Sequence, residues 1–170
     1  MLNNPPPTRL TSHLIKFLFE DSNHNLWAGT TNAGVNLIDP ETFKIKHFTH
    51  SYPDSTGFWG HAATSIIETR DRLIWIGGNG LNCYNPANGR FTHYTTKDGL
   101  PNSKVLTLCE DASGRLWIGF ENGLGRYHPQ KKLFEPAPLE KYQIPPHTGF
   151  TSSIRLSSGL MVFGGPDGLI

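Results

Sequence analysis

The segment LWIGFENGL at residues 116–124 decides the fold of this 170-residue chain, because it recurs along the sequence. Further versions begin at Leu26, Ile74 and Met161, and each places a glycine three residues after its first residue. The first three versions carry a tryptophan at their second residue: Trp27, Trp75 and Trp117. Self-similarity with a period of about 40–50 residues predicts a propeller or a solenoid.

The similarity extends well beyond the tryptophan segment. Seven residues before each tryptophan stands a glutamate, and these are Glu20, Glu68 and Glu110. Five residues after the Val or Leu that closes each segment stands a proline, and these are Pro40, Pro86 and Pro129. Agreement at so many separate offsets indicates a structural repeat.

Each repeat is expected to form four short antiparallel strands joined by hairpins, because short apolar runs alternate with turn-forming residues. The first run, 14–20, is apolar enough for a strand buried on both faces. The fourth, 45–49, carries charged residues typical of an exposed edge. Such a unit cannot bury its own faces and needs stacked neighbours, for which the β-propeller is the usual solution.

The expected fold class is therefore all-β, a β-propeller fragment of about three and a half four-stranded antiparallel blades in an open arc. Three prolines make residues 1–9 an extended tail. The blades are expected at residues 10–50, 51–96 and 97–137, with a partial, truncated fourth blade at 138–170.

Composition excludes several classes of partner. Lys plus Arg is 15 and Asp plus Glu is 14, so the net charge of +1 predicts no nucleic-acid partner. Cys83 and Cys109 form no disulfide framework or CxxC pair. No apolar run approaches membrane-spanning length, and the N-terminus lacks the features of a signal peptide. We therefore expect no membrane segment in this chain.

The spelling of the repeat resembles the two-component regulator propeller repeat. Residues 110–119, EDASGRLWIG, match its pattern almost fully, and residues 26–30 and 35–40 match it well. The stretch DGLPN at residues 98–102 is similar to the connection between blades in that family. The last unit, 159–165, lacks the tryptophan and is similar to the final blade of the family.

The resemblance implies a function as well as a fold. Such propellers form the periplasmic sensing region of bacterial hybrid histidine kinases and are often tuned to carbohydrates. The implied partners are a carbohydrate ligand, the remaining blades and the downstream signalling domains. The second unit departs from the pattern, with Thr69 in place of aspartate and Gly78 in place of threonine.

The repeated residues have a structural and a functional interpretation. Trp27, Trp75 and Trp117 could stack on sugars, but their fixed strand position favours packing between blades. Glu20, Glu68 and Glu110 could form a carboxylate ring for a metal or for acid–base chemistry, but their periodicity favours hydrogen bonds to turns or neighbouring blades. Because glycosidases need two carboxylates placed asymmetrically, and no histidine pair has ligand spacing, we expect no catalytic residue, no metal and no cofactor.

The residues that do not repeat point to a ligand site. The long loop at residues 50–62 contains Tyr52, Phe58, Trp59 and His61, which have no counterparts in the third unit. Loops on a rigid scaffold often carry binding residues, so these four are the candidate ligand-binding side chains. The alternative is that they are tucked against the ends of the blades.

The sequence therefore predicts a non-catalytic sensory module. Two alternatives stay open: a fragment of a propeller enzyme, such as a lyase or glycosidase, with its catalytic residues elsewhere, or a scaffold that binds another protein across its blade edges. The bare outer faces of the first and last blades predict association into homo-oligomers.

Overall fold

The computed structural model describes residues 9–50, 57–142, 144–145, 148–166 and 168–170. They form four antiparallel sheets in chain order, three of four strands and one of three. The helical content of the described residues is limited to two short 3-10 segments, η1 (Thr96–Asp98) and η2 (Leu139–Tyr142). The all-β propeller fold expected from the repeat is confirmed.

The four sheets are the blades of the propeller. Blade 1 contains β1 (Ile15–Glu20), β2 (Leu26–Thr30), β3 (Val35–Ile38) and β4 (Ile45–Phe48). Blade 2 contains β5 (Ala63–Glu68), β6 (Ile74–Gly78), β7 (Gly80–Asn85) and β8 (Arg90–Tyr94). Blade 3 contains β9 (Val105–Glu110), β10 (Leu116–Phe120), β11 (Gly123–His128) and β12 (Leu133–Pro136). Blade 4 contains β13 (Ser152–Arg155), β14 (Met161–Gly165) and β15 (Gly168–Leu169).

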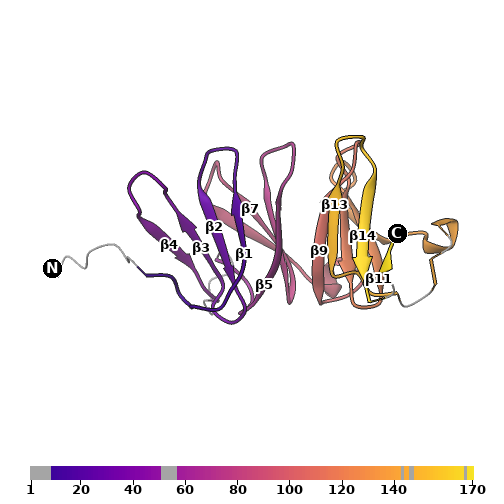
Figure 1. Ribbon diagram of the computed structural model, residues 1–170, viewed down its shortest axis with the longest axis horizontal. Coiled ribbons are helices and arrows are strands. Elements are labelled where there is room, and N and C mark those ends of the chain that lie inside the picture. The colour runs from indigo at the N-terminus through magenta and orange to yellow at the C-terminus, as the bar shows by residue number, and fades with distance from the viewer. Residues whose placement is uncertain (1–8, 51–56, 143, 146–147, 167) are drawn as a thin grey trace.

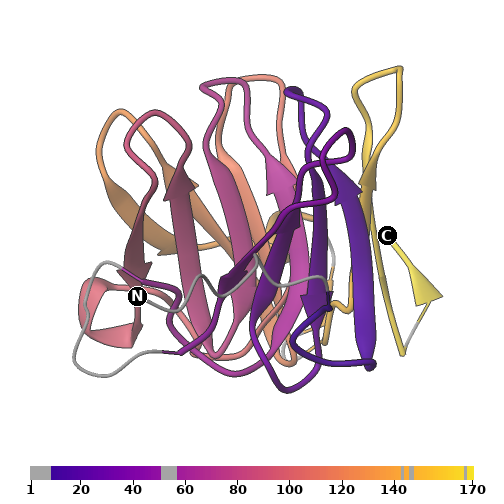
Figure 2. The same ribbon diagram turned by 90° about the vertical axis from the view of Figure 1, so that its left-hand side faces the viewer.

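The blades follow one another in chain order along the long axis of the molecule (Figure 1). Strands within each blade pair with their sequence neighbours, so the first and last strands lie at opposite edges of each sheet. The first strand of each blade contacts the first strand of the next, in the series β1, β5, β9 and β13. The hairpin turns consequently project at the two ends of the blades (Figure 2).

The expectation that the first strand is buried on both faces is wrong. The Leu18 side chain in β1 is 64% exposed, whereas Leu108, at the same register position in β9, is 6% exposed. The difference arises because Leu108 faces blade 2, while no blade in the described part of the chain covers the Leu18 face. Ile154 in blade 4 is 58% exposed on the opposite side of the arc.

Three apolar layers hold the blades together, and each contains one tryptophan of the repeat. Trp27, Trp75 and Trp117 are at most 4% exposed and belong to three separate clusters, each built from two consecutive blades. Their rings lie 5.3, 5.2 and 6.2 Å from an aromatic ring of the following blade, which is Tyr84, Tyr127 and Phe163 respectively. Burying an indole contributes roughly 4–6 kcal/mol before opposing terms.

In blades 2 and 3, the glycine two residues after the tryptophan allows the close approach of the next blade. A Cβ on Gly77 would lie 2.6 Å from Val105 Cγ1, and a Cβ on Gly119 would lie 3.0 Å from Phe150 Cβ. Val105 and Phe150 begin the following repeats, so the spacing of the sequence pattern reflects direct contact between blades.

The repeated glutamates join one blade to the turn of the blade before it. Glu68 Oε2 accepts a hydrogen bond from the backbone N–H of Ser22 at 2.7 Å. Glu110 Oε1 accepts the backbone N–H of Arg70 at 3.2 Å. Glu20, in the first blade, instead contacts His24 of its own turn at 2.6 Å. The geometry supports a structural role for the glutamates.

In blades 1 and 3, the aspartate after the repeated glutamate accepts the indole N–H of the tryptophan. Asp21 Oδ2 accepts the indole N–H of Trp27 at 2.9 Å, and Asp111 Oδ2 accepts that of Trp117 at 3.0 Å. Each Asp also accepts backbone N–H groups of its own turn. A single carboxylate therefore stabilises both the turn and the interblade aromatic layer.

Candidate functional site

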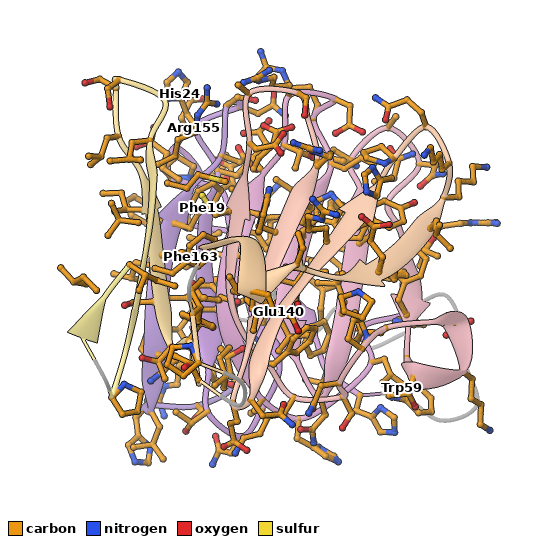
Figure 3. All side chains as sticks on the ribbon, turned by 90° about the vertical axis from the view of Figure 1, so that its right-hand side faces the viewer. Phe19, His24, Trp59, Glu140, Arg155 and Phe163 are labelled. Atoms are coloured by element: carbon orange, nitrogen blue, oxygen red, sulfur yellow. The ribbon has the colours of Figure 1, made fainter. Side chains whose placement is uncertain are left out.

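The connection between blades 1 and 2 presents a large aromatic ring on a fixed backbone. Trp59 N donates to Asn82 Oδ1 at 2.9 Å, and Asn82 Nδ2 donates to the Trp59 carbonyl at 3.1 Å. The Trp59 residue is nevertheless 36% exposed. It lies at the end of the blades opposite to His24 and Arg155 (Figure 3). A ring held in this way loses little conformational freedom when a ligand binds.

The same backbone clamp occurs in blade 1 but is replaced in blade 3. Asn36 Oδ1 accepts the backbone N–H of Thr11 at 3.0 Å. In blade 3 the two positions hold Pro101, which has no N–H, and Gly125, where an added Cβ would lie 3.0 Å from the proline ring. Among the three connection residues, Thr11, Trp59 and Pro101, only Trp59 carries an exposed aromatic ring.

Three imidazoles lie near the Trp59 ring, two beside the ring itself and one beside His50. The ring centroid of Trp59 lies 4.8 Å from that of His50 and 6.0 Å from that of His93. The centroid of His61 lies 5.2 Å from that of His50. His93 Nδ1 lies 2.9 Å from Asn82 Oδ1, so this nitrogen carries the proton, because an amide oxygen can only accept.

The candidate residues of the loop differ in their exposure to solvent. Trp59 and His61 are exposed at the surface, as a ligand-binding role requires. Phe58 is 2% exposed and packs against Phe91 at 5.8 Å, so it belongs to the core between blades 1 and 2. Its burial is a correction to its proposed role in ligand contact and fits the alternative of a residue tucked against the blades. Tyr52 lies outside the described residues.

The cluster can recognise a ligand that has both an apolar face and hydroxyl groups. The indole face of Trp59 offers a surface for stacking, and the surrounding imidazoles offer both donors and acceptors. Sequence reasoning missed His50, Asn82 and His93. The one available signal was that Asn36 and Asn82 each directly follow the Val or Leu that closes the tryptophan segment in the first two repeats.

A larger cavity lies elsewhere and has a different chemistry. Its volume is about 570 Å³, and its lining between blades 3 and 4 is mainly apolar, with Trp117, Leu124, Met161 and Phe163. In the other two junctions the space beside the tryptophan is filled by a tyrosine of the next blade. We therefore interpret this cavity as part of the packing layer between two blades, at the place where the other two junctions hold a tyrosine.

Neither metal chemistry nor thiol chemistry is supported by the described residues. No group of three or more His, Cys, Asp or Glu side chains in them is arranged to hold a metal ion. Burial raises the pKa of the Cys83 thiol to about 12 and that of the Cys109 thiol to about 11. Both cysteines are free and buried, so they contribute to packing.

Comparison with known proteins confirms the family resemblance. Residues 99–122 match the family described as two component regulator propeller. Over 167 residues the chain is 35% identical to Histidine kinase P4 of Formosa agariphila, a match that covers 95% of this chain and 12% of the kinase. The chain therefore spans about an eighth of that relative. No helix among the described residues has the length and apolar character needed to cross a membrane.

Solved structures show the same architecture. The extracellular domain of hybrid two component system BT3049 from B. thetaiotaomicron superposes with a TM-score of 0.81 at 25% identity, covering 95% of this chain and 22% of that domain. Virginiamycin B lyase from Staphylococcus aureus superposes with a TM-score of 0.66 at 18% identity, covering 91% of this chain and 50% of the lyase. The similarity to the lyase shows a shared fold alone.

Proposed function

We propose that this chain, which carries the two-component regulator propeller repeat, is part of the sensing region of a bacterial two-component signalling protein and recognises a carbohydrate outside the cytoplasm. The match to a histidine kinase and the likeness to an extracellular domain of a hybrid two-component system support this assignment. In this proposal the chain itself is a recognition module, and catalysis belongs to the kinase part of the protein.

The observation that carries the proposal is the exposed Trp59 ring on its clamped backbone. Sugar rings present C–H faces that pack against an indole, and their hydroxyl groups pair with polar side chains at the rim. His50 and His61 provide that rim. The Asn82 side chain bonds both the backbone N–H and the carbonyl of Trp59, so the backbone that carries the ring is fixed before the ligand binds.

The position of the site suggests how binding would be transmitted. Phe58, the residue before Trp59, is buried in the layer that joins blades 1 and 2. A ligand that binds one arrangement of this connection more tightly than another shifts the balance between the two, by an amount set by the difference in affinity. The blade junction is thus the element through which the site acts on the rest of the propeller.

A catalytic function receives less support from the geometry. Glu68 and Glu110 are engaged by backbone N–H groups of the preceding blades, and Asp21 and Asp111 by their turns and tryptophans. Acid–base or nucleophilic catalysis needs a distinct group of side chains converging on one reacting atom. In the described residues these carboxylates serve the repeat instead.

The test is a binding measurement on the full-length protein. Short neutral and acidic oligosaccharides are titrated by calorimetry into the wild type and into Trp59→Ala and His61→Ala variants. Phe43→Ala is the matched control, because Phe43 is an exposed aromatic residue, 73% exposed, in the turn between β3 and β4. We expect binding to be lost in Trp59→Ala, weakened in His61→Ala and unchanged in Phe43→Ala, with unchanged melting temperatures. Equal affinity in Trp59→Ala and the wild type would remove this connection from the site.

A further inference from the structure

Blade 2 lacks the aspartate that accepts the indole N–H of the repeated tryptophan in blades 1 and 3. Thr69 stands where Asp21 and Asp111 stand in blades 1 and 3. The turn itself is retained, because Thr69 N donates to Leu73 O at 3.0 Å as the aspartates do to their own partners. The Thr69 hydroxyl donates to Asp71 Oδ1 at 2.6 Å rather than pairing with the indole.

The Trp75 ring nevertheless packs against the same kinds of neighbour as the ring of Trp27. Trp75 stacks on Tyr94 of its own blade at 5.7 Å and lies 5.2 Å from Tyr127 of the next blade. Trp27 makes the corresponding contacts, with Phe48 at 5.9 Å and with a tyrosine of blade 2 at 5.3 Å. Trp75 and Thr69 both line the cavity at this junction.

The Trp75 indole lies at the wall of a cavity that solvent can enter. Trp75 is 3% exposed, and the part of the chain that the structure describes supplies no acceptor for its Nε1. Together with Thr69 and Asp71, Trp75 lines a cavity of about 140 Å³ between blades 2 and 3. One water needs only about 10–15 Å³ of such space, so the cavity has room for a small molecule. An N–H group without a protein acceptor at the wall of such a cavity can donate to solvent or to a ligand.

The matching junction between blades 1 and 2 provides an internal comparison. A hollow also lies there between the turns, lined by Ser22, Asn23 and residues of the next blade, but it does not reach Trp27. The difference follows from Asp21, whose carboxylate covers the Trp27 N–H. Replacing that aspartate by the shorter Thr69 exposes the indole edge at the junction of blades 2 and 3.

The remaining lining determines which ligand suits the cavity. Arg70 reaches from blade 2 to the Ala112 carbonyl at 2.6 Å and lies 3.7 Å from Glu110. The carboxylates of Asp71 and Glu110 accept hydrogen bonds, and with one guanidinium the group is net negative, which disfavours an anion. Indole and guanidinium donors beside carboxylate acceptors, above aromatic and apolar side chains, suit a neutral molecule with several hydroxyl groups.

We propose that the cavity between blades 2 and 3 is a second binding site, which takes a small neutral polyol or the hydroxyl edge of one sugar ring. One ligand oxygen accepts the Trp75 N–H, and ligand hydroxyls donate to Asp71 and Glu110. The site lies beside the turn between β5 and β6, which corresponds to the turn of His24 in blade 1, and Figure 3 shows His24 at the opposite end of the blades from Trp59. It does not depend on the function proposed for the Trp59 connection.

The test follows the Trp75 indole N–H by nuclear magnetic resonance in protein labelled with ¹⁵N-tryptophan. Trp75→Phe assigns the signal, and meso-erythritol, D-xylose and acetate are the probes. A ligand of this size binds with millimolar affinity at ordinary ligand efficiency. We expect the signal to shift on titration with erythritol or xylose and not with acetate.

The decisive variant restores the turn of blade 3, in which the corresponding residues are Asp111 and Ser113. Thr69→Asp combined with Asp71→Ser places a carboxylate on the Trp75 N–H, so we expect a higher melting temperature together with loss of the polyol-induced shift. Asn23→Ser, the equivalent turn position in blade 1, is the control and keeps the response.

Two results would overturn the proposal: no Trp75 shift with either polyol, which would mean that the cavity holds water only, or a shift that persists in the Thr69→Asp, Asp71→Ser protein. The Trp59→Ala protein keeps the response, so failure at either site is distinguishable from failure at the other.

Discussion

Removing the Asp111 carboxylate should destabilise the propeller more than its position in a surface turn suggests. The Asp111 side chain is only 8% exposed and accepts the indole N–H of Trp117 as well as the N–H groups of Ser113 and Arg115. Asp111→Ala removes the carboxylate that accepts the Trp117 indole N–H, in a layer where Trp117 is 4% exposed.

The expected loss can be estimated from these bonds. An unsatisfied buried donor costs about 1–3 kcal/mol, and hydrogen bonds to a charged acceptor contribute about 1.5–3 kcal/mol. The turn N–H groups reach solvent after the substitution and recover part of their loss. We therefore expect Asp111→Ala to lower the free energy of unfolding by about 3 kcal/mol.

The contribution of Asp111 should also depend on pH. Burial alone would raise the pKa of Asp111, but hydrogen bonds from Trp117, Ser113 and Arg115 outweigh burial and hold this pKa well below its ordinary value of 3.8. Since the folded-state pKa is lowered, the stabilisation is fully present above that ordinary value and is lost as the pH falls toward the folded-state pKa. The stability difference between wild type and Asp111→Asn should therefore shrink below about pH 4.

The assay is urea unfolding followed by tryptophan fluorescence and circular dichroism. Asp39→Ala is the matched control, because Asp39 accepts the N–H groups of Glu41 and Thr42 in an exposed turn without a tryptophan. In a double-mutant cycle, Asp111→Ala should cost about 1–2 kcal/mol less in a Trp117→Phe background. Equal losses in the Asp39 and Asp111 variants, or strict additivity with Trp117→Phe, would refute the reasoning.

Three further predictions follow from the packing between blades. Gly77→Val should destabilise the protein by about 2–3 kcal/mol, because its Cβ would lie 2.6 Å from Val105 Cγ1; an unchanged unfolding midpoint would contradict the contact. Cys83, with its pKa raised to about 12 mainly by burial, should resist iodoacetamide at pH 8 in the native protein and react in urea, whereas rapid native labelling would show that blade 2 opens. Leu18→Asp should reduce concentration-dependent association in sedimentation experiments, since Leu18 is 64% exposed; identical sedimentation would exclude that face.

The fold could be predicted from sequence because its determinants are periodic. Each tryptophan packs against the following blade, and Gly77, Gly119, Glu68 and Glu110 also contact a neighbouring blade. The same contacts therefore recur at a regular spacing in the sequence. The burial of β1 could not be predicted in the same way. An apolar run indicates what a strand can bury, and Leu18 is exposed because burial also depends on the neighbouring blade.

The candidate site could be predicted only in part, because its determinants occur once. Trp59 and His61 have no counterparts in the third repeat, and this indicated a special loop. The sequence could not separate Trp59 from the adjacent Phe58, since only the path of the connection decides which ring enters the core. The roles of Asn82 and His93 depend on pairing between β7 and β8, which brings a polar cluster together from positions distant in sequence.

The most direct test of the proposed recognition function measures signalling output as a function of a bound saccharide. Full-length wild type and Trp59→Ala are compared in cells with a reporter for the two-component response, using the oligosaccharide that binds best in calorimetry. Our account predicts a dose-dependent response in the wild type, a flat response in Trp59→Ala at equal protein levels, and an unaltered saccharide after incubation with purified protein. An equal response in both proteins, or conversion of the saccharide by the propeller itself, would contradict it.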